Sequence, residues 1–103
     1  MARLLDSAAA VFAETGYKAA TMTEIAARAG APIGSLYQFF PNKSVIADAL
    51  VARYSTHIKS ALETIREKAP HLSATELADE LLDVFIRHAK ERNLVLSVLD
   101  ARW

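Results

Sequence analysis

Apolar residues recur three or four positions apart along almost the whole chain. The first such stripe consists of Leu4, Leu5, Ala8, Val11 and Phe12. This spacing puts all of its members on one face of a helix. Gly16 follows the stripe and can adopt the left-handed conformation that ends a helix, so the pattern predicts a first helix over residues 2–15.

A second, shorter stripe begins after a helix-start signal. Thr21 is followed three residues later by Glu24, which is the spacing of a capping box: the hydroxyl accepts an amide of the first turn and the carboxylate reaches back. The inner stripe is Ile25, Ala26 and Ala29. Gly30 marks its end. Small alanines let another helix approach closely at a steep angle, as a helix-turn-helix requires.

Another short helix follows this turn. Pro32 suits its first position because proline has no amide hydrogen to leave unpaired. The helix should run to Phe39, with Leu36 and Phe40 facing inward. The two short helices predict a helix-turn-helix from about residue 21 to residue 40, although such a pair also occurs in helical bundles that do not bind DNA.

A long helix should come next. Asn42 is its expected N-cap, and it should reach about Lys68 before Ala69 and Pro70 end it. Its apolar stripe comprises Ile46, Leu50, Tyr54, Ile58, Leu62 and Ile65. This is the longest helix that the pattern predicts.

The last third of the chain starts with a second capping box, Ser73 to Glu76. The predicted core face of the helix that it opens is Leu77, Leu81, Phe85 and Ala89. Asn93 is the predicted stop. Residues 94–103 fit a helix or a strand by periodicity alone, and the helical neighbourhood favours a helix. The sequence therefore predicts an all-α fold.

Composition narrows the class of protein. The chain has 103 residues, of which 52% are hydrophobic and 23% charged, as in a folded protein. It has no cysteine, which excludes disulfides and thiolate zinc sites, and the cytoplasm is the expected compartment. Residues 1–13 resemble a signal peptide, but Asp6 and Ser7 interrupt the apolar run. No uncharged stretch is long enough for a membrane span, so we expect a soluble protein without a membrane partner.

The net charge and the candidate catalytic residues give little further information about function. Twelve basic residues balance twelve acidic ones, so net charge gives no support to a nucleic-acid partner. His57 and His71 lack metal-ligand spacing. His88 shares a helix with Asp79, Glu80 and Asp83, but acids in the first half and bases in the second are what the helix dipole favours. We predict no enzymatic activity, no metal and no cofactor.

Four motifs together identify a family. They are Phe12-Ala-Glu-Thr-Gly-Tyr17, Thr21-Met-Thr-Glu-Ile-Ala-Ala-Arg-Ala-Gly30, Gly34-Ser-Leu-Tyr37 and Phe40-Pro-Asn-Lys43. In this order and spacing they resemble the TetR family of transcriptional regulators, from residue 4 to about residue 50. Beyond residue 50 the chain resembles the family only in being helical.

The resemblance implies an organisation. Residues 1–48 would be a three-helix, helix-turn-helix DNA-binding domain, and residues 49–103 a long connecting helix and the first helices of a ligand-binding and dimerisation domain, apparently truncated. The implied function is that of a repressor that binds a palindromic operator as a homodimer and is released by a small-molecule effector. Because the family pairs its subunits through later helices, we expect the 103-residue chain to be mainly monomeric and to bind DNA weakly. The alternative is a helical ligand-sensing or interaction module that does not read DNA.

Three residues are the candidates for phosphate contacts, which position a protein on DNA without reading its sequence. Tyr37 matches the family tyrosine whose hydroxyl reaches a phosphate, and it is otherwise a core aromatic. Lys43 matches the family's phosphate clamp at the first turn of the long helix, and it is otherwise a solvated lysine. Thr23 stands in the first turn of its helix, where its hydroxyl can contact a phosphate or cap the helix.

The base-facing candidates are Ile33, Gly34, Ser35 and Gln38, because Leu36 and Phe40 belong to the core. An amide can donate and accept at adenine, which makes Gln38 the best single reader unless it is only a solvated helix residue. Ser35 can bond either base class, Ile33 can touch a thymine methyl, and Gly34 permits close backbone approach.

Two departures from the family pattern concern the same helix. Phe39 stands where histidine is common, which removes a polar contact, and Pro32 stands where Ser or Thr often caps the helix. No Arg or Lys lies between Arg28 and Lys43, so the recognition helix cannot make the usual bidentate contact to guanine. We therefore expect modest sequence specificity or a reliance on DNA shape.

Overall fold

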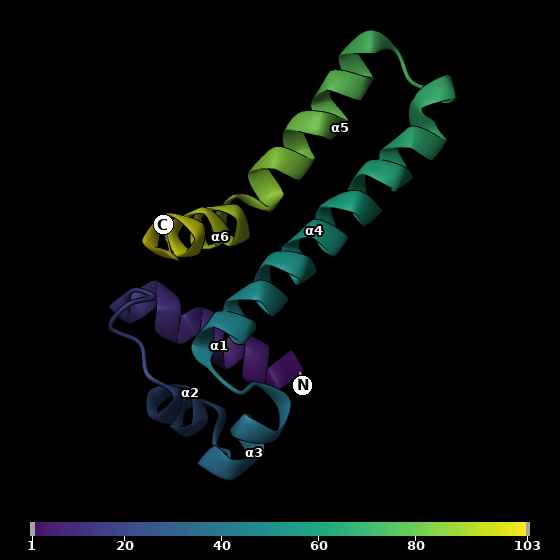
Figure 1. The fold of residues 1–103 in the computed structure, drawn as a ribbon. Helices are drawn as coiled ribbons and strands as arrows, with labels where there is room; N and C mark the ends of the chain where they lie inside the picture. Colours follow the sequence, from purple (N-terminus) through teal and green to yellow (C-terminus); the bar gives the residue numbers. More distant parts are fainter. Residues whose placement is uncertain (1, 103) are drawn as a thin grey trace.

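The computed structural model describes residues 2–102. Within them the chain forms six α-helices and one short 3₁₀ turn, and the all-α prediction is confirmed (Figure 1). The elements are α1 (Ala2–Thr15), α2 (Met22–Ala29), α3 (Ile33–Phe39), α4 (Lys43–Lys68), η1 (Ala69–His71), α5 (Ala74–Arg87) and α6 (Ala89–Arg102). Trp103, the last residue of the predicted C-terminal segment, lies outside the described residues.

Helices α1, α2 and α3 surround one apolar core at one end of the molecule (Figure 1). Its most enclosed members are Ala8, Ile25, Leu36 and Ala47, each fully buried. Gly16 ends α1 with a φ of 83° and Gly30 ends α2 with a φ of 66°, both in the left-handed region that glycine tolerates. The two predicted helix stops are therefore confirmed.

Helix α4 leads away from this core for 26 residues, and α5 runs back along it (Figure 1). Asn42 caps α4 as predicted, because its Oδ1 accepts the Val45 amide at 3.0 Å. The apolar stripe of α4 is buried only at its two ends. Ile46, Leu50 and Ile65 are buried, Tyr54 and Ile58 are half-buried, and Leu62 is exposed.

Helix α6 returns to the first end of the molecule and packs on α1 and α4 (Figure 1). Val98 is 2% exposed and belongs to the same core cluster as the residues of α1 and α2. Arg102 fastens the end of α6 to α4, with a 2.8 Å contact to Asp48 and a 3.2 Å contact to Ser44. The helix chosen for the C-terminal segment is confirmed over its described part.

The predicted stop at Asn93 is wrong. Helix α5 ends at Arg87, and Asn93 lies inside α6. The break occurs where side chains satisfy the last carbonyls of α5: His88 Nδ1 lies 3.0 Å from the Val84 carbonyl oxygen, and Arg92 donates to the Phe85 carbonyl at 2.8 Å.

The predicted core face of α5 is also wrong. Val84 is the buried residue of this helix, whereas Leu81 is 44% and Phe85 58% exposed. Leu77 and Ala89 are half-buried, and Ala89 belongs to α6. Helix α5 has one wide apolar face, but only its edge at Val84 is buried, while Leu81 and Phe85 near its centre are exposed, so periodicity could not tell which part of the face would meet α4.

Two helix starts differ in detail from the predictions. Pro32 precedes α3 as its cap residue, with an extended ψ of 143°, and does not occupy the first helical position. The Thr21 hydroxyl accepts the Glu24 amide at 3.1 Å, as predicted. The Glu24 carboxylate, however, accepts a hydrogen bond from the Thr21 hydroxyl at 3.0 Å and not from the Thr21 backbone amide. The second capping box, between Ser73 and Glu76, is confirmed with both of its bonds.

No helix in residues 2–102 is long and apolar enough to cross a membrane.

Candidate nucleic-acid interface

The turn between α2 and α3 fixes how the two helices cross. Gly30 donates to the Ala27 carbonyl at 3.1 Å, and Ala31 donates to the Ala26 carbonyl at 3.0 Å. These bonds satisfy carbonyls at the end of α2 and turn the chain sharply. Ala29 is 3% exposed, so its methyl group leaves room for close packing of the two helices.

Helix α3 fully buries one side chain and leaves most of the others exposed. Leu36 is fully buried, whereas Ile33 is 41% exposed. Gly34 and Gln38 are exposed, and Ser35 is half-buried. Three of the four predicted base-facing residues therefore lie on the open surface of α3, and Ser35 lies at its edge. Their contacts with bases stay a prediction.

The predicted phosphate ligands have different surroundings. Thr23 is exposed in the first turn of α2. Tyr37 is 48% exposed, so it is not the core aromatic that the alternative interpretation assumed. Both hydroxyls have no protein partner among the described hydrogen bonds. Their phosphate contacts stay a prediction that the geometry permits.

Lys43 is engaged with the protein's own backbone. Its ammonium donates to the carbonyls of Tyr17 and Lys18 at 2.8 Å each and to that of Ala20 at 3.0 Å. It also lies 4.9 Å from the centroid of the Tyr17 ring. Lys43 is therefore not the solvated lysine of the alternative interpretation, and its predicted phosphate contact has three intramolecular competitors.

One cation near the helix-turn-helix was missed by sequence reasoning. A Cβ built on Gly30 would lie 3.4 Å from Nη2 of Arg3, so this guanidinium sits beside the turn between α2 and α3. Arg3 stands at the start of α1, far from the motif in sequence, and no local signal could have placed it there. Arg28, in the last turn of α2, pairs instead with Glu14 of α1.

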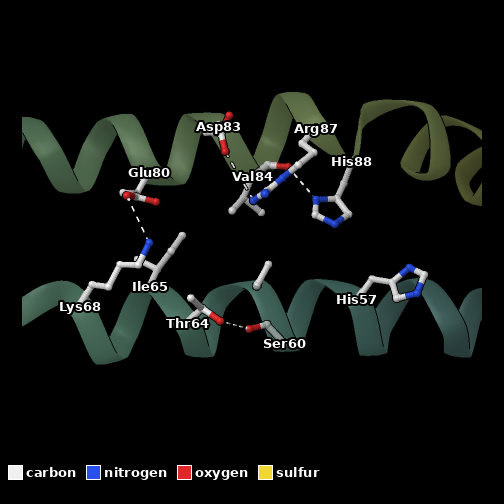
Figure 2. A pocket seen from close by; sticks show the side chains of 11 residues that line it. His57, Ser60, Thr64, Ile65, Lys68, Glu80, Asp83, Val84, Arg87 and His88 are labelled. Atoms are coloured by element: carbon white, nitrogen blue, oxygen red, sulfur yellow. Dashed lines mark hydrogen bonds and ion pairs between the residues drawn. The ribbon is translucent and has the colours of Figure 1, made fainter.

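The other end of the molecule has a polar cleft of about 530 Å³ between α4 and α5 (Figure 2). Lys68 of α4 and Glu80 of α5 point toward one another and are 3.6 Å apart. On α5 itself, Arg87 lies 3.5 Å from Asp83. His88 lines the cleft but bonds the backbone, and no metal-binding group of three or more acidic, His or Cys residues occurs in residues 2–102. The cleft is thus lined by acids and bases that already pair.

Comparison with known proteins supports the interpretation of the first half of the chain as a helix-turn-helix domain. The sequence model described as "Bacterial regulatory proteins, tetR family" matches residues 4–50. The HTH-type transcriptional activator FasR of Mycolicibacterium smegmatis is 34% identical over 84% of this chain and 40% of its own length. The HTH-type transcriptional repressor KstR2 of Mycobacterium tuberculosis is 48% identical over 47% of this chain and 24% of its own length.

The fold is also similar to a solved structure. A crystal structure of a TetR-family transcriptional regulator from Streptomyces coelicolor matches with a TM-score of 0.62 and 32% identity, over 84% of this chain and 51% of that one. The chain thus spans less than half the length of these two curated relatives and about half of the solved chain. Its helix-turn-helix, its motifs and these similarities agree: the chain belongs to the TetR family of bacterial transcriptional regulators.

Proposed function

We propose that this protein represses transcription by placing α3 in the major groove of a DNA operator. The observation that carries the proposal is the surface of α3, a seven-residue helix that buries Leu36 alone. Most of its other side chains are exposed, so packing within the chain does not explain their identity. A helix that is held by one core residue and otherwise open is suited to enter a groove about as wide as a helix.

The proposed contacts divide into two sets. Gln38, Ser35 and Ile33 would meet base edges, and Gly34 would let the backbone approach them. Thr23 and Tyr37 would bond phosphates on either side of the groove. A phosphate contact from Lys43, which the motif predicts, would require its ammonium to leave carbonyl oxygens that it already binds.

We further propose that a small molecule releases the operator and that the complete regulator acts as a homodimer in the cytoplasm. The cleft between α4 and α5 supports an effector site, because α4 continues from that cleft directly into the core beneath α3 (Figures 1 and 2). A dimer would place two α3 helices on successive major-groove faces, roughly 34 to 36 Å apart, on a palindromic operator. The name of KstR2 supports repression, and that of FasR shows that relatives with the same motif also activate.

Fluorescence anisotropy with a mixed-sequence DNA duplex tests the proposal. We expect binding at low salt that weakens as salt rises, because each phosphate that a Lys or Arg side chain neutralises releases bound counterions. A variant with Tyr37 and Thr23 changed to Phe and Val should bind more weakly by a similar factor at every salt concentration, because neutral hydroxyls bond phosphates without neutralising their charge. Absence of binding at low salt would contradict the proposal and favour a helical module that does not read DNA.

A further inference from the structure

The turn between α1 and α2 carries three carbonyl groups that the local backbone does not satisfy. After Gly16, the chain makes one backbone bond across the turn, from the Ala20 amide to the Gly16 carbonyl at 3.1 Å. Among the turn and cap hydrogen bonds described for residues 2–102, none brings an amide to the carbonyls of Tyr17, Lys18 or Ala20. Carbonyls that are partly buried and lack a donor destabilise a fold.

Lys43 supplies the missing donors from the first turn of α4. Its ammonium has three N–H groups, and the three carbonyl oxygens lie 2.8, 2.8 and 3.0 Å from Nζ. All of its donor capacity is therefore used within the protein. The bonds to Tyr17 and Ala20 are partly buried, which limits competition by water, whereas the bond to Lys18 is exposed.

The aromatic ring of Tyr17 adds a second connection at the same place. The Lys43 ammonium lies 4.9 Å from the ring centroid, within the range of a cation–π attraction. Tyr17 also contacts α1, because its ring packs edge to face against the ring of Phe12, with the two centroids 5.2 Å apart. Phe12 is 3% exposed and belongs to the core. A continuous set of contacts thus joins the N-terminus of α4 to α1 and to the entry of α2.

We infer that Lys43 is a positioning residue, which clasps the turn between α1 and α2 to the start of α4 and thereby sets the position of the helix-turn-helix, and that it does not bind DNA phosphate. The clasp holds both ends of the segment that contains α2 and α3, since Ala20 lies two residues before α2 and Lys43 begins α4, four residues after the end of α3. Loss of the ammonium would leave three carbonyls unpaired and let the two ends of the motif separate. The inference rests on the proposed DNA-binding function only for its effect on affinity.

The two roles predict different salt dependences for Lys43→Met, which keeps the length of the side chain and removes its charge. A positioning role predicts that affinity for a mixed-sequence duplex falls by the same factor at every salt concentration, with the slope of log K against log [salt] unchanged. A phosphate contact predicts a slope shallower by about 0.9. Lys59→Met is the matched control, because Lys59 is an exposed lysine of the same helix.

Thermal unfolding of the same variants gives the second measurement. We expect Lys43→Met to lower the midpoint by at least roughly 4 to 8 °C, because several charge-assisted bonds are lost, and Lys59→Met to leave it nearly unchanged. Lys43→Arg should rescue little of this loss, because a planar guanidinium cannot direct three donors onto one cluster of carbonyls as an ammonium does. A Lys43→Met variant as stable as the wild type, or full rescue by arginine, would overturn the inference.

If Lys43→Met does not fold, NMR of the wild-type chain can still test the inference. The ammonium of a clasped lysine should exchange slowly enough with water to give a resolved ¹H–¹⁵N signal without DNA, and this signal should not shift when the duplex is added. An absent signal, or a shift on binding, would overturn the inference. If the wild type binds no DNA, the proposed function fails, whereas the DNA-free signal and the thermal midpoints still decide whether the clasp exists.

Discussion

At the scale of single residues, the outward surface of α3 combines side chains of different chemistry. Gln38 can donate and accept at once, and it is exposed near the end of the helix. Tyr37 and Phe39 flank it and are each about half exposed, at 48% and 50%. Arg3, beside the turn at Gly30, places a positive charge near a helix that has none of its own. Readout by α3 should therefore depend on an amide and on apolar contacts more than on charge.

Gln38→Ala should remove the discrimination at one base position. We expect a loss of roughly 1 to 3 kcal/mol there, because the paired donor and acceptor bonds of an amide are lost, and nearly unchanged preference elsewhere. Selection from a randomised DNA pool with wild type and variant measures this. Thr23→Val is the control, and it should weaken all sequences alike. Identical base preferences for wild type and Gln38→Ala would show that Gln38 is not a reader.

Residue roles were predictable where the signal is local. Gly16 and Gly30 end their helices because no other residue tolerates those backbone angles as well, and Asn42 caps α4 because its side chain reaches its own helix. Lys43 was correctly assigned to the first turn of α4, but its partners lie more than twenty residues away in sequence. Nothing in the local pattern distinguishes a lysine that binds carbonyls from one that binds phosphate.

At the scale of elements, the start of α5 is the most completely capped. Ser73 accepts the Glu76 amide at 3.1 Å, and the Glu76 carboxylate accepts the Ser73 amide at 2.9 Å. The bonds from Ser73, first from its backbone and then from its side chain, lower the pKa of Glu76. A carboxyl whose pKa falls on folding stabilises the fold at pH values above its ordinary pKa, about 4.3, and loses that effect as pH falls through the lower, folded value.

Glu76→Gln should therefore lower the thermal midpoint at about pH 7, and the difference from wild type should shrink as pH falls below the ordinary glutamate pKa of about 4.3. Glutamine keeps an oxygen that can accept the Ser73 amide, so the comparison isolates the negative charge. Thermal unfolding followed by circular dichroism across this pH range measures the difference. A gap between the two proteins that does not change with pH would mean that the charge of Glu76 contributes nothing to the cap.

Elements were less predictable in the second half of the chain. Leu77, Leu81 and Phe85 do recur at helical spacing, yet Val84 is the residue that α5 buries against α4. Helix α5 is amphipathic, but most of its apolar face, including Leu81 and Phe85, is exposed, so the apolar pattern does not reveal which part of that face packs on α4. The boundary at His88 also has no signal in the apolar pattern, because it depends on side chains that bond the last carbonyls of α5.

At the scale of the whole molecule, α5 and α6 are attached very differently. Helix α5 contributes one buried residue, Val84, whereas α6 contributes Val95 and Val98, and Val98 belongs to the core that α1, α2, α3 and α4 share. Contacts at both ends of α6 strengthen this attachment: Glu91 lies 3.0 Å from His57, and Arg102 lies 2.8 Å from Asp48. The helix-turn-helix and α6 should therefore unfold as one cooperative unit, from which α5 can open separately.

Native-state hydrogen exchange of the 103-residue chain tests this division. Amides of α1 and α6 should share one free energy of opening, and amides of α5 should open at a lower one. Val98→Ala removes two methyl groups from the common core and should lower protection in α1 and α6 together by roughly 2 kcal/mol. Val84→Ala, the matched change on the other helix, should lower protection in α5 alone. If Val98→Ala left the exchange of α1 unchanged, α6 would be a separate unit, and movement of α6 could not reach the DNA-binding helices through the core.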